Sequence, residues 1–388
     1  MLLFSVQDAN IASGETWELT RPNGASCENI VEATVDALAA PVDFPALAAA
    51  IVPGDRVAFA VDPNIPFIDQ VVKGAIDAVR KTEAGEIDIV LWDEATDETV
   101  ELVKQVATGC SVYRHQCDSR AELSYLAADA EADPIYLSRY LVEADFVLPI
   151  MAIRPCEPGA DVDVTGIFPT LTDSATRQRA TEQSLQKSAH RKMPTGNVIN
   201  KEVPWLLGVQ LVCGVVVNDA GNLGAVVAGT IEAMVEQQPP QAAPARASLV
   251  IASLDGNDQQ QSWENILRAI RGAELQADDD ATIVVWTELC HPPEGAMLAI
   301  DDDQFEETVS PIGDEADGLP AWDRSYSHAI ALRPMLQDYR ILLHSQLAQD
   351  DVERLGLGVV ESLAELANLS RGFASCCVVR AAGYAGNL

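Results

Sequence analysis

The chain has 388 residues, more than the roughly 250–300 at which single hydrophobic cores stop growing, so its length predicts about two domains. Its 25 basic and 59 acidic side chains give a net charge of −34, which disfavours nucleic acid and anionic membrane surfaces as partners. Hydrophobic residues make up 48% of the chain, enough to bury a core, which excludes global disorder.

The cysteines and the N-terminus indicate the compartment. The eight cysteines show no C-x-x-C pair and no regular spacing, so they do not resemble a disulfide framework. The opening segment MLLFSVQDAN lacks the basic and apolar regions of a signal peptide, and no apolar stretch reaches the 18 residues of a membrane span. We therefore expect a cytoplasmic protein without a membrane-spanning helix.

Short apolar strands alternate with helices between residues 55 and 150. The helix expected over 67–80 has one buried face, because its apolar residues recur at helical spacing. We expect strands at 55–62, 87–92, 110–115 and 144–150, and helices at 67–80, around 100–106 and near 135–143. Strands that are apolar on both faces and alternate with helices predict a parallel, doubly wound sheet.

The middle of the chain predicts a polar helix, a hairpin and a connector. Residues 151–204 are irregular apart from the polar helix at about 173–190. Two apolar runs at 210–218 and 223–229, joined by the turn DAGN, predict a β-hairpin. After a helix over 230–237, the proline- and alanine-rich segment 237–247 reads as a semi-rigid connector.

Beyond the connector the alternation restarts, with strands expected at 247–254, 281–289, 340–345 and 376–384 and helices at 262–271, 326–337 and 358–369. An acidic connection between 289 and 324 is long enough to form a lid or binding loop. The fold class is therefore α/β, with two domains that each contain a parallel or mixed sheet, helices on both faces, and a cleft between them. We assign 1–240, possibly joined by 372–388, to the first domain and 248–371 to the second.

Sequence motifs for catalysis are missing. No G-x-G-x-x-G, P-loop or G-x-S-x-G pattern occurs, and no two histidines stand at metal-binding spacing. Cys110, His115 and Cys117 cannot share one face of a strand, and the adjacent Cys290 and His291 point opposite ways on a strand. We therefore expect no metal site and assign no catalytic residue from motifs.

Position identifies possible ligand-binding residues instead. Ligands of open α/β sheets bind outside the carboxyl ends of strands, which selects Asp62 and Asn64, although a plain proline-stiffened turn is the simpler interpretation of this loop. Arg268 and Arg271 share a helix face and can hold a carboxylate, unless they belong to a solvated face where Arg268 pairs with Glu264. The predicted ligand is a small organic acid.

The order of these segments resembles the nickel-dependent lactate racemase family across almost the whole chain. The pieces that carry the resemblance are AAPVDFPAL, VAFAVDPNIP, ADFVLPI, PTLTDSAT, TGN at 195–197, VVVNDAGNLGAVVAGTIEA and WENILRAIRGAE. The resemblance implies two α/β domains that close on a nickel-pincer nucleotide, which is tethered to a lysine and ligated through nickel by a histidine. It also implies hydride transfer from C2 of lactate, with two histidines that exchange the hydroxyl proton.

At the positions of this sequence that match the family's reactive residues, most of these residues are replaced. Asp62 is retained, but Ile65 stands where the family has arginine and Thr165 stands where it has the tethering lysine. The nickel histidine falls near Thr181, and the segments LWDEATDET and IRPCEPG contain no counterpart of the two proton-transferring histidines. Arg271 is the charged counterpart of the substrate-side lysine.

We therefore predict a lactate racemase-like protein whose nickel-pincer site is degenerate and which carries no cofactor. Such a protein is a binding or regulatory homologue, or has a divergent activity on a small carboxylate. The alternative is an active racemase or epimerase of lactate or another 2-hydroxy acid, in which His115, His190 and Lys187 or Lys192 replace the family's residues. The sequence leaves open whether the protein is an enzyme.

Overall fold

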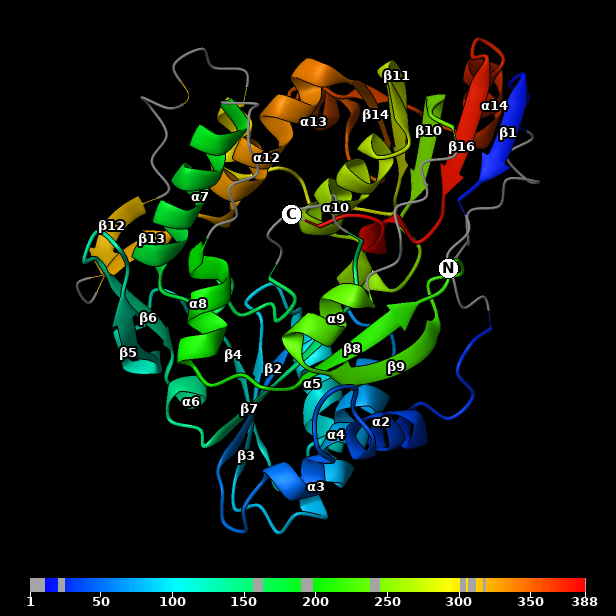
Figure 1. Cartoon of the computed structure of the whole chain (residues 1–388). Helices are drawn as coiled ribbons and strands as arrows, with labels where there is room; N and C mark the ends of the chain where they lie inside the picture. Colours follow the sequence, from blue (N-terminus) through cyan, green and yellow to red (C-terminus); the bar gives the residue numbers. More distant parts are fainter. Residues whose placement is uncertain are drawn as a thin grey trace.

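Two six-stranded sheets with helices on both faces form the protein (Figure 1), which confirms the predicted α/β fold class. The computed structural model describes residues 11–19, 25–155, 163–189, 198–237, 245–300, 305, 312–316 and 319–387. Within these ranges no helix combines the length and apolar character that crossing a membrane requires.

The first sheet lies in the lower half of Figure 1 and has the strand order β4-β3-β2-β7-β8-β9. Its strands are parallel except for the antiparallel pair β8–β9, so the predicted hairpin is confirmed. The bounds are β2 (Val57–Val61), β3 (Ile87–Leu91), β4 (Ser111–Arg114), β7 (Phe146–Ala152), β8 (Val212–Val217) and β9 (Leu223–Gly229).

Alternate residues of this sheet are buried on opposite faces. Phe59 of β2 packs with α2 (Ile30–Ala39) and α4 (Ile68–Arg80), whereas Ala58 and Ala60 pack with α6 (Arg139–Val142) and α8 (Val198–Leu206). This two-sided burial explains the continuous apolar runs of the strands. The remaining helices of this half are α3 (Leu47–Ala50), α5 (Asp97–Val106), α7 (Ser174–Ala189), α9 (Ile231–Glu236) and the 3₁₀ turn η1 (Arg120–Glu122).

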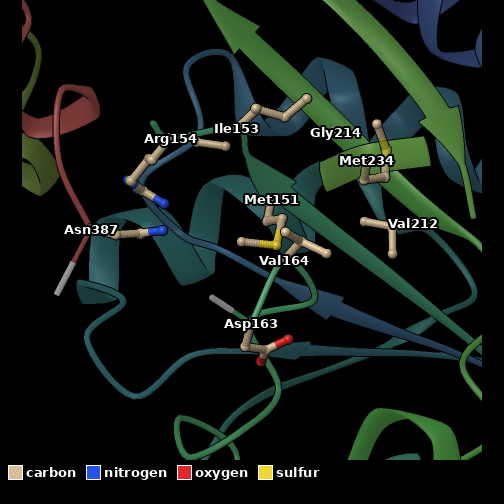
Figure 2. A pocket seen from close by; sticks show the side chains of 10 residues that line it. Met151, Ile153, Arg154, Asp163, Val164, Val212, Gly214, Met234 and Asn387 are labelled. Carbon is tan, nitrogen blue, oxygen red and sulfur yellow. The ribbon is translucent and has the colours of Figure 1, made fainter. Parts of the chain in front are cut away.

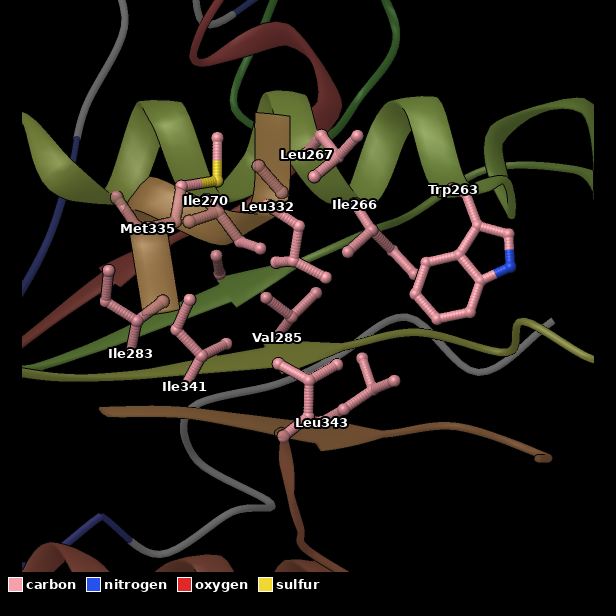
Figure 3. Packing of buried hydrophobic residues seen from close by; sticks show 14 of the residues in the cluster. Trp263, Ile266, Leu267, Ile270, Ile283, Val285, Leu332, Met335, Ile341 and Leu343 are labelled. Carbon is pink, nitrogen blue, oxygen red and sulfur yellow. The ribbon is translucent and has the colours of Figure 1, made fainter. Parts of the chain in front are cut away.

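The second sheet is entirely parallel, with the order β1-β16-β10-β11-β14-β15. Its strands are β1 (Glu15–Glu18), β10 (Ala247–Ser253), β11 (Ala277–Trp286), β14 (Arg340–His344), β15 (Gly358–Val359) and β16 (Ser375–Val379). Figure 3 shows Ile266 and Ile270 of α10 (Trp263–Glu274) packed over Ile283 and Val285 of β11. The other elements are α12 (Arg324–Asp338), α13 (Gln349–Glu353), α14 (Leu363–Ser370), η2 (Asp258–Gln260), η3 (Gly295–Ala299) and η4 (Ala382–Tyr384).

One local prediction is wrong. Where a helix was expected near 135–143, β6 (Pro134–Ser138) pairs with β5 (Leu123–Ala128), and only the short α6 follows. Ile135 and Leu137 are buried while Tyr136 between them is partly exposed, so the local period is that of a strand. The acidic connection also contains a hairpin, β12 (Ile312–Ala316) and β13 (Leu319–Trp322), in its described part.

The end of the chain joins the two halves. After β16, Ala381 and Tyr384 pack in the core of the first sheet, while Ala382 and Ala385 pack in the core of the second. The strands β1 and β16, from opposite ends of the chain, both belong to the second sheet. The domain boundaries 1–240 and 248–371 stay a prediction, because the segment 381–385 packs in the hydrophobic cores of both sheets.

Candidate functional site

The carboxyl ends of the first sheet's strands face α10 and α12 of the second half. Asp62 follows β2, Glu94 follows β3, His115 follows β4 and Arg154 follows β7. Contacts from this edge reach the N-terminal half of α10, where Asn265 lies. The junction is therefore where the crevice rule for open α/β sheets places a ligand site.

Asp62 is fully buried at this junction and is held by four donors, one of which is the backbone N–H of Ala152 at 3.4 Å. Its carboxylate accepts hydrogen bonds from Arg154 Nη1 at 2.8 Å, from the Asn64 backbone N–H at 2.9 Å and from Asn64 Nδ2 at 3.1 Å. Burial by itself raises the pKa of Asp62, but the positive charges of Arg154 and Arg268 outweigh burial and lower it. Asp62 is therefore an ionised, positioned carboxylate.

Asn64 links the two halves of the molecule. Its Oδ1 accepts from Asn265 Nδ2 at 2.9 Å, and its backbone carbonyl accepts from Gln260 Nε2 at 2.7 Å and from the Tyr384 hydroxyl. Asn265 Oδ1 in turn accepts from Arg268 Nη1 at 2.9 Å. A continuous chain of buried hydrogen bonds thus runs from the loop after β2 into α10.

Arg268 lies in this network, but its guanidinium already holds a carboxylate. Nη1 and Nη2 of Arg268 contact the two oxygens of Glu94 at 3.1 and 2.8 Å, and both side chains are 8% exposed. Burial lowers the pKa of Arg268, but Glu94 more than compensates and the pKa is raised. Arg271 is 39% exposed and pairs with Glu274 at 2.9 Å, outside the network. The structure therefore gathers Asp62, Asn64 and Arg268 and leaves Arg271 apart, and their role in ligand binding stays a prediction.

A second chain of charges crosses the same junction. Asp93 accepts from Arg177 Nη1 at 2.7 Å and lies 3.2 Å from Arg324, which is 3.3 Å from Glu264. Glu264 also lies 3.0 Å from His328 Nε2. The crevice rule selects the loop that carries Asp93, but no sequence pattern marked Arg177 or Arg324, which lie on helices distant in the chain.

His115 and Cys117 lie beside this second chain of charges as buried, uncharged groups. His115 Nε2 is 2.9 Å from the carbonyl oxygen of Thr172, and burial together with the positive charge of Arg177 lowers its pKa to about 4. Burial raises the pKa of the Cys117 thiol to about 11. Cys290 and His291 are exposed, with Sγ and Nδ1 3.8 Å apart. The buried Cys117 thiol is therefore not an activated nucleophile.

The position that resembles the cofactor tether does not fit a pincer nucleotide. Thr165 is 1% exposed, and both its backbone N–H and its hydroxyl donate to Asp163. The ring of Trp92 packs on Gly166, where an added Cβ would lie 2.3 Å from the indole. In the described part of the chain, no three His, Cys, Asp or Glu side chains are placed to hold a metal. The side chains of Lys187, His190 and Lys192 lie outside the described residues.

A hollow opens beside Arg154 at the carboxyl end of β7 (Figure 2). The hollow is small and partly open to solvent. Its lining side chains come from β7, β8, α9, the loop at 163–164 and the C-terminal segment: Met151, Ala152, Ile153, Arg154, Asp163, Val164, Val212, Gly214, Met234 and Asn387. Among the described residues, nothing accepts a hydrogen bond from Arg154 Nη2, although this nitrogen is buried.

The protein is a two-sheet α/β protein, in which one mixed and one parallel sheet meet across a buried polar junction. No protein-family model and no curated protein matches the sequence. Among solved structures, the lactate racemase apoprotein from Thermoanaerobacterium thermosaccharolyticum superposes with a TM-score of 0.72 at 12% identity, covering 100% of this chain and 97% of that chain. A Thermotoga maritima protein from a structural-genomics consortium superposes with a TM-score of 0.61 at 10% identity, covering 88% and 93%.

The chain therefore has the lactate racemase fold along its whole length, and the predicted resemblance is confirmed at the level of the fold. The function of the fold's relatives does not follow from this likeness, because unrelated functions share folds and are decided by the site.

Proposed function

We propose that this lactate racemase-fold protein binds a small organic acid where its two halves meet and does not perform nickel-pincer chemistry. The observation that carries the proposal is the state of Thr165, whose hydroxyl is engaged by buried Asp163 at the position that resembles the cofactor tether. A threonine hydroxyl cannot replace the amine from which a pincer nucleotide hangs.

The surrounding residues support the same proposal. Ile65, which stands at the family's arginine position, is 3% exposed and belongs to the hydrophobic core of the first sheet. Asp93 and Glu94, in the segment that corresponds to a proton-transferring histidine, are held by arginines. A proton shuttle near neutral pH needs a group such as imidazole, and these carboxylates are engaged as counter-ions.

The negative part of the proposal is tested by loading. The purified protein is incubated with nickel-pincer nucleotide beside an active lactate racemase as positive control. Nickel content, intact mass and interconversion of D- and L-lactate are then measured. We expect no stoichiometric nickel, no lysine adduct and no racemisation. An adduct on Lys187 or Lys192 together with racemisation would show that the alternative, an active racemase, is correct.

The positive part is tested by thermal unfolding. A carboxylic acid that binds only the folded state stabilises it by RT ln(1 + [L]/Kd), so the midpoint of unfolding rises with the logarithm of the acid concentration once this exceeds Kd. We expect at least one acid of two to five carbons to raise the midpoint above that in sodium chloride of equal ionic strength. A panel without any such shift would contradict the proposal.

A further inference from the structure

The hollow beside Arg154 combines one polar corner with an apolar wall. Met151, Val164, Val212 and Met234 contribute buried apolar surface to it. Gly214 allows Ile153 to lie across the neighbouring strand, because an added Cβ would be 2.6 Å from Ile153 Cδ1. Pockets of this kind, apolar with few convergent polar groups, are typical of small-molecule sites.

Arg154 forms the polar corner with one nitrogen left over. Its Nη1 donates to Asp62 at 2.8 Å and its Nε donates to the carbonyl of Gly383 at 3.3 Å. Arg154 is only 3% exposed, and its Nη2 has no acceptor among the described residues. Buried donors are nearly always satisfied, so an acceptor is expected at this nitrogen.

Asn387 supplies a second polar group at the same place. Figure 2 shows the ends of the Arg154 and Asn387 side chains directed at the same part of the hollow. A guanidinium N–H beside an amide N–H matches the two oxygens of a carboxylate, and hydrogen bonds from a charged donor are the stronger kind.

Among its described lining residues, the hollow offers no further unengaged polar side chain. Asp163 is the other charged lining residue, but its Oδ1 accepts from Thr165 and its Oδ2 accepts from the N–H groups of Ile167 and Phe168 at 2.8 and 2.9 Å. Its oxygens are therefore already engaged by its own loop. A hydroxyl on the ligand would be buried without a partner, which is unfavourable.

We propose that this hollow binds a short, unbranched aliphatic monocarboxylate, the size of propionate or butyrate. The carboxylate accepts from Arg154 Nη2 and Asn387, and the hydrocarbon chain contacts Met151, Val164 and Met234. This inference rests on the proposed function, which is the binding of a small organic acid. It goes further because it names the binding site and states that ligands with a 2-hydroxyl group bind weakly. The guanidinium of Arg268 is already paired with Glu94, so it connects the two halves and does not bind the ligand.

The test measures binding to the full-length protein by calorimetry, with butyrate as the probe and sodium chloride at equal ionic strength as the reference. We expect 2-hydroxybutyrate, butyramide and butylamine to bind at least tenfold more weakly than butyrate. Asn387→Asp places a negative charge beside the carboxylate without touching the Asp62–Arg154 pair, so we expect at least a tenfold loss of butyrate affinity. The matched control Arg271→Gln, outside the hollow, should leave the affinity unchanged.

The outcomes separate this inference from the proposed function. Equal binding of butyrate and butyramide, or unchanged affinity in Asn387→Asp, would overturn the carboxylate site. If 2-hydroxybutyrate binds at least as tightly as butyrate does, the claim that the site rejects a 2-hydroxyl group is wrong. The proposed binding of a small acid would still stand. Nickel loading together with racemisation would overturn the proposed function. The butyrate measurements would then still show separately whether the hollow binds a carboxylate.

Discussion

Three carboxylates at the junction are each paired with an arginine. Asp62 faces Arg154, Glu94 faces Arg268 and Asp93 faces Arg177. Burial of an unpaired ion costs several kcal/mol, so each carboxylate depends on its arginine. His115 follows the other route: it is buried beside Arg177 and stays neutral, because that positive charge and burial both oppose its protonation.

The neutral state of His115 predicts a pH dependence of stability. Its pKa is about 4 in the folded protein and near 6.5 in the unfolded chain, so below pH 6.5 the unfolded chain binds a proton that the folded protein does not. The contribution of His115 is fully present above pH 6.5 and is lost as the pH falls towards 4, by up to about 3 kcal/mol. Urea unfolding at pH 7 and pH 4.5 measures this loss.

His115→Gln keeps a donor for the Thr172 carbonyl and removes the titration, so its stability should fall less between pH 7 and 4.5 than that of the wild type. The exposed His291→Gln is the matched control and should fall as much as the wild type. Equal falls in all three proteins would show that His115 does not titrate in this way.

Sequence reasoning found the part of the site that obeys a local rule. Asp62 and Asn64 follow a strand with a clear apolar pattern, so the crevice rule selects them. Arg154 was missed because it stands in the irregular segment IRPCEPG, and its partners Asp62 and Gly383 are 92 and 229 residues away. Arg268 was identified, but its partner Glu94, 174 residues away, could not be.

At the scale of elements, the sequence predicts the buried strands and the amphipathic helices. It does not predict elements that form only because a distant segment pairs with them. The strands β2, β3, β7 and β10 are mainly apolar and are buried on both faces, so their own residues define them. In contrast, the strand β1 has the sequence ETWE and three of its four residues are exposed. It is a strand because β16 from the other end of the chain pairs with it, which no local pattern reports.

The contact between α10 and the C-terminal segment depends on a glycine. A Cβ added at Gly272 would lie 2.4 Å from Ala385 Cβ and 2.7 Å from the Ala385 carbonyl carbon. Alanine gains up to about 1 kcal/mol of helix propensity, but overpacking costs about 1–3 kcal/mol. We expect Gly272→Ala to lower the free energy of unfolding by about 1–2 kcal/mol in urea denaturation.

The matched control is Gly372→Ala, an exposed glycine whose added Cβ would meet only Leu369 O at 3.4 Å. This variant should be within about 0.5 kcal/mol of the wild type, as surface substitutions usually are. A Gly272→Ala protein at least as stable as the wild type would mean that the C-terminal segment does not press on α10.

At the scale of the whole molecule, two hydrophobic cores are joined by polar bonds. Each sheet has its own core, and within the described ranges only the segment 381–385 contributes side chains to both large clusters. Polar contacts that connect the halves include the Asn64–Asn265, Glu94–Arg268 and Asp93–Arg324 pairs and the hydrogen bonds of Gln259 and Gln260 to the loops after β2 and β3. Separation of the halves would expose the terminal segment and leave these groups without their partners, so the halves are energetically coupled.

This coupling predicts that the protein unfolds in a single calorimetric transition and that Glu94→Gln lowers its stability. The substitution leaves the buried Arg268 without a counter-charge, and removal of one partner of a buried ion pair costs about 3–5 kcal/mol. We expect a loss of about 3 kcal/mol with the transition still single. The control Glu101→Gln breaks the exposed pair with Lys104 and should cost no more than about 0.5 kcal/mol. Two separate transitions in the wild type, or equal effects of the two substitutions, would show that the junction does not hold the halves together.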